Sequence, residues 1–224
     1  MLGVSGAAES QLFWSDLRKP TRRELRIFGV RGNRMNRPTR QFSLIIVTLS
    51  LFNCNPVDKK QNNEIFAGHQ ISFYLTHDNI PQACKDLFSN VEHPADDTKT
   101  LALLDSLLTT NSETGPFYFL TVTRTIEKAD GAYSESLGLI GKQYLEKRTK
   151  EFVKYFIDES LLTDNDFENW AKIVAGEIQI SAEGQEKEEL ERLENQLILN
   201  CNTCSVGQIK KVKDFVVRVR YYCP

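Results

Sequence analysis

The sequence predicts an all-α protein, an irregular antiparallel bundle or array of about six to eight helices. From about Asp96 onward, apolar residues recur at intervals of three and four, which is the spacing of one helix face. The breaks between these periodic segments carry turn and capping residues. The breaks are also short, so neighbouring helices are expected to be antiparallel.

The first part of the expected domain, residues 65–90, is ambiguous. Ile71–Leu75 is rich in β-prone side chains and is compatible with a strand. Ile80–Phe88 has a helical pattern, with Asp78 as a candidate cap and Pro81 acceptable in the first turn.

Six apolar sets then predict successive helices. They are Leu101/Leu104/Leu108, Phe119/Val122/Ile126, Leu137/Ile140/Tyr144, Phe152/Phe156 with Val153/Ile157/Leu161, Phe167/Trp170/Val174 and Leu190/Leu193/Leu197. The expected breaks are Thr114-Gly115-Pro116, which ends one helix and starts the next, a tight turn at Asp130-Gly131, and a cap at Thr163 or Asp164.

The last segment fits a helix through Ile209, Val212, Phe215, Val216 and Val219. Residues 217–221 also alternate like an edge strand, but the longer pattern favours a helix.

Helix pairs are expected to begin near Asp97, Gly131 and Asn165, at intervals of about 34 residues. Tetratricopeptide repeats share this period, but their signature residues do not recur in register. An irregular array is therefore favoured over a repeat solenoid.

An apolar leader precedes this domain. Phe42–Phe52 is uncharged and too short to span a bilayer, but it matches the apolar core of a secretory signal. Arg37 and Arg40 lie just before it and Met35 starts the segment, so Cys54 becomes the twentieth residue if translation begins at Met35.

The leader ends in Leu51-Phe52-Asn53-Cys54, which resembles the lipobox of bacterial lipoproteins. The resemblance implies that the leader, residues 35–53, is removed and that Cys54 is acylated, which would anchor the chain to a membrane of the cell envelope. Asn55 in place of aspartate favours the outer membrane. Phe52 and Asn53 are larger than the residues common at these positions of the motif.

Four segments follow from this interpretation. Residues 1–34 are expected to be a disordered upstream extension, 35–53 the signal peptide, 54–64 a flexible polar tether and 65–224 the helical domain. Two alternatives remain open. The apolar run is a buried segment of a cytosolic domain with Cys54 an ordinary thiol, or the basic start of the chain is an arm that binds nucleic acid or an anionic surface.

Charge is distributed unevenly around Cys54. Nine of the 28 Lys and Arg residues and three of the 30 Asp and Glu residues precede it, which leaves a net charge of −8 for residues 54–224. An acidic domain argues against a nucleic-acid partner, because phosphate binding depends on clustered basic side chains.

The remaining cysteines are an even set, which in an exported protein predicts two disulfides among Cys84, Cys201, Cys204 and Cys223. Cys201-x-x-Cys204 could instead be a redox pair or half a zinc site. A bond to Cys223 would hold down the end of the chain.

The sequence has no Gly-x-x-x-x-Gly-Lys-Ser/Thr phosphate loop, no Gly-x-Ser-x-Gly elbow and no His-Glu-x-x-His zinc helix, and we expect no cofactor. A low-ranked alternative is a metal site or general base at His69, His77 and His93. Two further patterns have simple structural interpretations: Asp164-Asn165-Asp166 suits a helix cap, and the acidic run 183–194 suits a solvated face with Glu183–Lys187 and Glu188–Arg192 pairs. The aromatic run 117–120 is expected in the core, with a binding groove as the alternative.

The predicted function is that of a membrane-anchored envelope lipoprotein that binds a partner or has a structural role, and we do not expect an enzyme. The alternatives are an exported enzyme or metal-dependent protein that uses the histidines or Cys201 and Cys204, and an inhibitor or immunity-type binder of a secreted effector.

Overall fold

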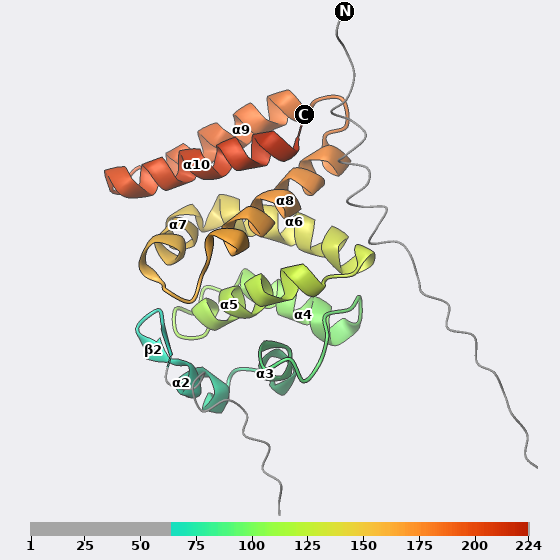
Figure 1. The fold of residues 1–224 in the computed structure, drawn as a ribbon, viewed down its shortest axis with the longest axis vertical. Coiled ribbons are helices and arrows are strands. Elements are labelled where there is room, and N and C mark those ends of the chain that lie inside the picture. The colour runs from blue at the N-terminus through green and yellow to red at the C-terminus, as the bar shows by residue number, and fades with distance from the viewer. Residues whose placement is uncertain (1–63, 224) are drawn as a thin grey trace, which may run out of the picture.

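The computed structural model describes residues 64–223. They form a stack of helices that begins with an antiparallel hairpin of two strands, each two residues long (Figure 1). The elements are β1 (Ile65–Phe66), β2 (His69–Gln70), α2 (Ile71–Thr76), α3 (Gln82–Phe88), α4 (Thr98–Leu107), α5 (Gly115–Thr125), the 3-10 helix η2 (Ile126–Lys128), α6 (Gly131–Lys147), α7 (Thr149–Asp158), α8 (Asp164–Ser181), α9 (Glu186–Asn200) and α10 (Val206–Tyr222).

The predicted all-α class is therefore confirmed. The described residues hold α2 to α10, which is more helices than we expected, because the ambiguous first region forms two short helices. The stack runs from α2 and α3 at one end to the paired helices α9 and α10 at the other (Figure 1).

Alternate helices form the spine of the array. Each of α4, α6 and α8 packs against the next helix but one, so that α4, α6, α8 and α10 form a continuous series. Helices α4, α6 and α8 begin at Thr98, Gly131 and Asp164, close to the predicted starts. They contain 10, 17 and 18 residues respectively, so the units are unequal and the array is irregular.

Side-chain caps explain where these helices begin. The Asp97 carboxylate accepts hydrogen bonds from the backbone N–H of Lys99 and Thr100 at 2.8 and 3.0 Å, which caps α4. Asp130 caps α6, which starts directly at Gly131. Of the two predicted caps, Thr163 and Asp164, Thr163 is the N-cap of α8 and forms a capping box with Asp166.

The start of the domain differs from two expectations. The β-prone run Ile71–Leu75 lies in helix α2, where Ile71 and Tyr74 share a fully buried face and the Tyr74 hydroxyl donates to the Phe66 carbonyl oxygen at 3.0 Å. Tertiary burial therefore overrides the local preference. Asp78 does not cap α3, because that helix begins at Gln82 with Pro81 at its N-cap.

In two helices the buried face differs from the predicted apolar face. Helix α4 buries Leu103, Leu104 and Leu107, while Leu101 and Leu108 lie at the edge of the buried face. In α7, the side chain of Ile157 is 47% exposed. The carboxyl-terminal segment is helical as favoured, since α10 continues to Tyr222.

The core is centred on the aromatic run of α5. Phe117, Phe119 and Leu120 are completely buried and Tyr118 is 6% exposed, so the core interpretation is confirmed and the groove alternative is wrong. The Phe119 ring has five aromatic neighbours with centroids within 6.0 Å: Tyr144, Phe152, Tyr155, Phe156 and Trp170. One residue of α5 thus connects α6, α7 and α8.

Charged side chains join α9 to α6. Lys142 contacts Glu189 at 2.7 Å, and Arg192 contacts both Glu189 and Glu146, at 2.6 and 2.7 Å. The predicted pairing of Arg192 with Glu188 is therefore wrong, because Arg192 turns toward the partly buried carboxylates between the two helices. Hydrogen bonding from Arg192 lowers the pKa of Glu189 to about 2.

A buried carboxylate lies in the contact between α6 and α8. Glu177 is 9% exposed and contacts the position of Gly138, and burial raises the pKa of its carboxyl group above the ordinary value. Its charged form is therefore disfavoured in the folded protein. The folded state keeps this proton to a higher pH than the unfolded state, so the contribution of Glu177 to stability falls as pH rises from its unfolded pKa through its folded pKa.

We therefore expect Glu177→Gln to increase the free energy of unfolding at about pH 7 and to leave it nearly unchanged at about pH 3.5. Urea denaturation followed by circular dichroism at both pH values measures this difference. Glu188→Gln is the control, because Glu188 is exposed and should show no pH-dependent gain. An equal gain from Glu177→Gln at the two pH values would contradict the assignment.

Candidate functional site

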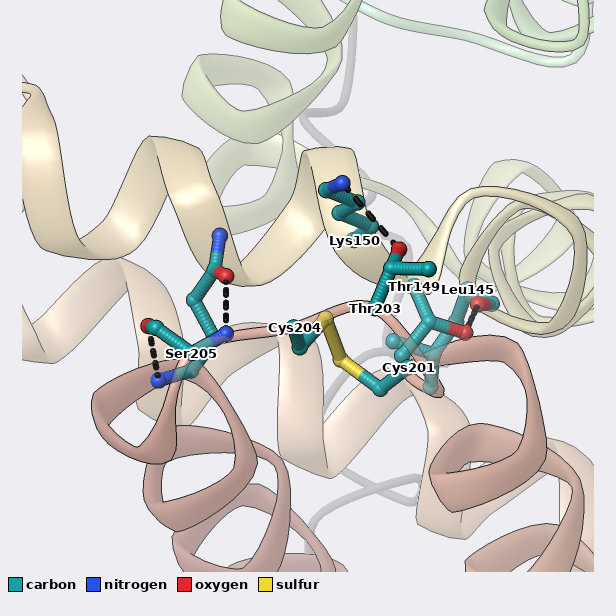
Figure 2. The surroundings of a disulfide bond; sticks show 8 residues. Leu145, Thr149, Lys150, Cys201, Thr203, Cys204 and Ser205 are labelled. Carbon is teal, nitrogen blue, oxygen red and sulfur yellow. Dashed lines mark hydrogen bonds between the residues drawn. A yellow bond between two sulfur atoms is a disulfide. The ribbon is translucent and has the colours of Figure 1, made fainter.

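The predicted cysteine set divides in the structure. Cys201 and Cys204 form a disulfide in the turn between α9 and α10, beside Thr149 and Lys150 of α7 (Figure 2). Lys150 Nζ of α7 donates to Oγ1 of Thr203, which lies in this turn, at 3.2 Å. The bond thus closes a short loop that connects two helices, which fits a structural role.

The second predicted disulfide does not form between the described cysteines. Cys84 on α3 and Cys223 after α10 are buried free thiols. They lie at opposite ends of the helix stack (Figure 1), so no disulfide can join them. Burial raises the pKa of both thiols, that of Cys84 to about 12, which makes them poor nucleophiles.

The three histidines do not converge. The rings of His69 and Phe73 stack with centroids 4.4 Å apart, His77 Nε2 lies 3.4 Å from a Glu113 carboxylate oxygen, and His93 is exposed in the loop before α4. Within residues 64–223, no group of three or more His, Cys, Asp or Glu side chains is placed to hold a metal ion.

Cys54 and its leader lie outside the described residues, as do residues 1–34 and most of the predicted tether. Across the part of the chain that the structure describes, none of the helices is long and apolar enough to cross a membrane.

A small pocket that the sequence did not indicate lies between the α4–α5 loop and the junction of α6 with α7. We call it the tyrosine pocket. Its volume is about 200 Å³, and its walls are formed by Leu107, the loop residues Thr109 to Ser112, Gly115, Pro116, Tyr144, Arg148, Glu151 and Tyr155.

Two buried tyrosines line this pocket. Tyr144 is 3% exposed and Tyr155 is 8% exposed, and both rings pack on Phe119, with centroid distances of 5.4 and 5.0 Å. Neither hydroxyl has a hydrogen-bond partner among the described residues. Since no fully buried polar atom of the described side chains lacks a partner, both hydroxyls reach the open space of the pocket.

Burial keeps both phenols protonated. It raises the pKa of Tyr144 well above the ordinary value, and the pKa of Tyr155 is raised by burial and by the nearby Glu151 carboxylate. At neutral pH both groups are therefore neutral hydrogen-bond donors. They are not nucleophiles or bases.

Arg148 brings the positive charge of the pocket. Its guanidinium donates to the Thr109 carbonyl oxygen at 3.2 Å and to Glu151 Oε1 at 3.3 Å. The Arg148 side chain is 25% exposed, whereas that of Glu151 is 49% exposed, so the carboxylate lies nearer the mouth. The pocket thus holds one charge of each sign.

The opposite wall is a well-ordered turn. Asn111 Oδ1 accepts hydrogen bonds from the backbone N–H of Glu113 and Thr114, at 2.8 and 3.3 Å, and its carbonyl oxygen accepts from Gly115 N at 2.9 Å. These bonds hold the loop in place before α5 begins.

One sequence signal could have pointed to this pocket. Tyr144, Arg148, Glu151 and Tyr155 follow at intervals of four, three and four residues, which places them on one face of a continuous helix. In the sequence Tyr144 belongs to the apolar set Leu137/Ile140/Tyr144, whereas Glu151 and Tyr155 belong to the following helix, so the two helices are predicted separately.

A wider depression of about 520 Å³ lies on the other side of the α4–α5 loop, lined by Asn79, Asp105 and Tyr118 among others. It is more open to solvent, and the Tyr118 hydroxyl already donates to the Asn79 carbonyl oxygen at 3.3 Å. The tyrosine pocket is the better candidate because the hydroxyls of two of its tyrosines have no hydrogen-bond partner among residues 64–223.

This arrangement is suited to binding. Its donors are neutral phenols and a guanidinium, and its only carboxylate is half exposed and paired with Arg148. Comparison with known proteins adds no assignment, since neither a family model, nor a curated protein, nor a solved structure matches the chain.

Proposed function

We propose that this chain is a lipid-anchored binding protein of a bacterial cell envelope. The observation that carries the proposal is the leader of residues 35–54, in which a basic start and a short apolar run end at Leu51-Phe52-Asn53-Cys54. In this proposal Cys54 is acylated and becomes the first residue of the mature protein, and residues 65–224 form the exported domain.

The helical domain supports a binding role. Its described residues offer a preformed pocket with two unpaired hydroxyls, and they do not bring the candidate catalytic groups together. Of the groups invoked for an enzyme, the histidines are dispersed and Cys201 is bonded to Cys204. No observation in the described residues favours the enzymatic alternative.

The anchor sets the expected location. Several acyl chains on one cysteine, at about 0.8 kcal/mol per buried CH₂, would hold the domain at a membrane far more firmly than a single chain. Asn55 follows the cysteine, and we propose the outer membrane because aspartate at this position can retain lipoproteins at the inner membrane of some Gram-negative bacteria.

Mass spectrometry of the mature amino terminus, after expression in a bacterial host, tests the anchor. We expect an acylated fragment that starts at Cys54, recovered from the membrane fraction. Cys54→Ser should give an uncleaved or soluble product, and Cys84→Ser should leave acylation unchanged. A stable, unacylated protein that begins at Met1 would contradict the proposal.

A further inference from the structure

We propose that the tyrosine pocket binds a small α-amino acid with an apolar side chain, its carboxylate at Arg148 and the two tyrosine hydroxyls and its ammonium group at Glu151. This inference deepens the proposed binding function by naming the class of ligand. The geometry of residues 107–116 and 144–155 carries it, independently of whether Cys54 is acylated.

Size limits the ligand first. The pocket volume of about 200 Å³ is below the ~300–1,000 Å³ of sites for drug-sized molecules. A water molecule occupies about 30 Å³ of liquid, so the space corresponds to a ligand that displaces only a few waters. A single amino acid fits this limit, whereas a folded partner can reach no further than the mouth.

Two tyrosine hydroxyls of the pocket are available as donors to a ligand. Tyr144 and Tyr155 are more than nine-tenths buried, yet neither hydroxyl bonds to a described residue. Because both hydroxyls reach the open space of the pocket, a ligand there can accept hydrogen bonds from them, and hydrogen bonds to a charged group are stronger than those between neutral groups. A ligand carboxylate would accept from both phenols and from the guanidinium of Arg148, which recognises carboxylates through parallel N–H donors.

Charge then favours a zwitterion. Arg148 and Glu151 stand 3.3 Å apart and bring one charge of each sign to the pocket. A simple anion would meet repulsion from Glu151, and a simple cation would meet repulsion from Arg148. An amino acid satisfies both groups, and the greater exposure of Glu151 places the ammonium group toward the mouth.

Two apolar lining residues suit a small apolar side chain of the ligand. Leu107 is 2% exposed and Pro116 lies in the buried first turn of α5. Both line the pocket. An aliphatic side chain would gain about 25 cal/mol for each Å² of apolar surface that it buries there.

Isothermal titration calorimetry on the purified full-length chain tests the inference. We expect saturable binding of L-leucine or L-alanine with a dissociation constant below about 1 mM. Acetate and leucinamide, which each lack one of the two charges, should bind at least about tenfold more weakly. The same titration on Cys54→Ser should give the same affinity, which separates pocket binding from the lipid anchor.

Two conservative variants locate the ligand. Tyr144→Phe and Tyr155→Phe keep the rings on Phe119 but remove the hydroxyls, and each should weaken amino-acid binding about tenfold without lowering the unfolding temperature. Tyr133→Phe is the matched control: its hydroxyl is paired with Thr125 Oγ1 at 2.8 Å, so this change should lower stability and leave binding unchanged.

Three results would overturn the inference. They are the absence of saturable binding by any amino acid up to about 10 mM, unchanged affinity in both pocket variants, and acetate or leucinamide binding as tightly as leucine.

Discussion

Replacing Trp170 with alanine is expected to lower the free energy of unfolding by about 3–5 kcal/mol, the range for truncating a large aromatic residue in a core. Trp170 is completely buried in α8. Its ring stacks on Phe119 with centroids 5.5 Å apart, and its Nε1–H donates to Thr123 Oγ1 at 2.9 Å. The change would leave a cavity where α5, α6 and α8 meet.

Urea denaturation of the Trp170→Ala variant, followed by circular dichroism, measures this loss. Leu199→Ala is the control, since Leu199 is also apolar but 67% exposed, and its effect should stay within about 0.5 kcal/mol. A loss below about 1 kcal/mol for Trp170→Ala would show that the indole is not the centre of the core.

The second large effect is expected at Gly141, where leucine should lower the free energy of unfolding by about 1–3 kcal/mol or more. A Cβ atom added at Gly141 would lie 3.0 Å from Cζ3 of the buried Trp170 ring. Any larger side chain must push α6 away from α8. The usual gain in helix propensity over glycine, about 0.8–1 kcal/mol, is too small to offset this.

Gly131→Leu is the matched control for Gly141→Leu, because both glycines lie in α6 and a Cβ at Gly131 would meet nothing within 4 Å. We expect no loss of stability at Gly131. Differential scanning calorimetry of both variants provides the comparison. Equal destabilisation at the two positions would mean that the contact between α6 and α8 is not what requires glycine at 141.

The helices were predictable because their signals are local. The apolar sets of Phe119/Val122/Ile126 and Phe167/Trp170/Val174 are buried as expected, since three- and four-residue spacing defines a helix face without reference to the rest of the chain. Caps are equally local, because a side chain such as that of Thr163 bonds to backbone three residues away.

The errors arose where distant contacts decide the outcome. Ile71–Leu75 has β-prone residues, but its burial against the hairpin and α5 makes it helical. The expected pair of Arg192 with Glu188 relied on spacing within one helix, whereas Glu146 of α6 reaches Arg192 from another helix. Neither contact can be read from a window of neighbouring residues.

Local sequence signals and long-range contacts also contribute differently to the functional proposals. The sequence alone supplied the proposal of a leader that ends at Cys54, the acidic charge of the domain and the spacing of its helices, because each depends on consecutive residues. The tyrosine pocket required the tertiary structure, because residues 107–116 and 144–155 meet only when α4, α5, α6 and α7 pack together. Both phenol rings pack on Phe119, and the proposed role of their hydroxyls as donors to a ligand depends on this packing.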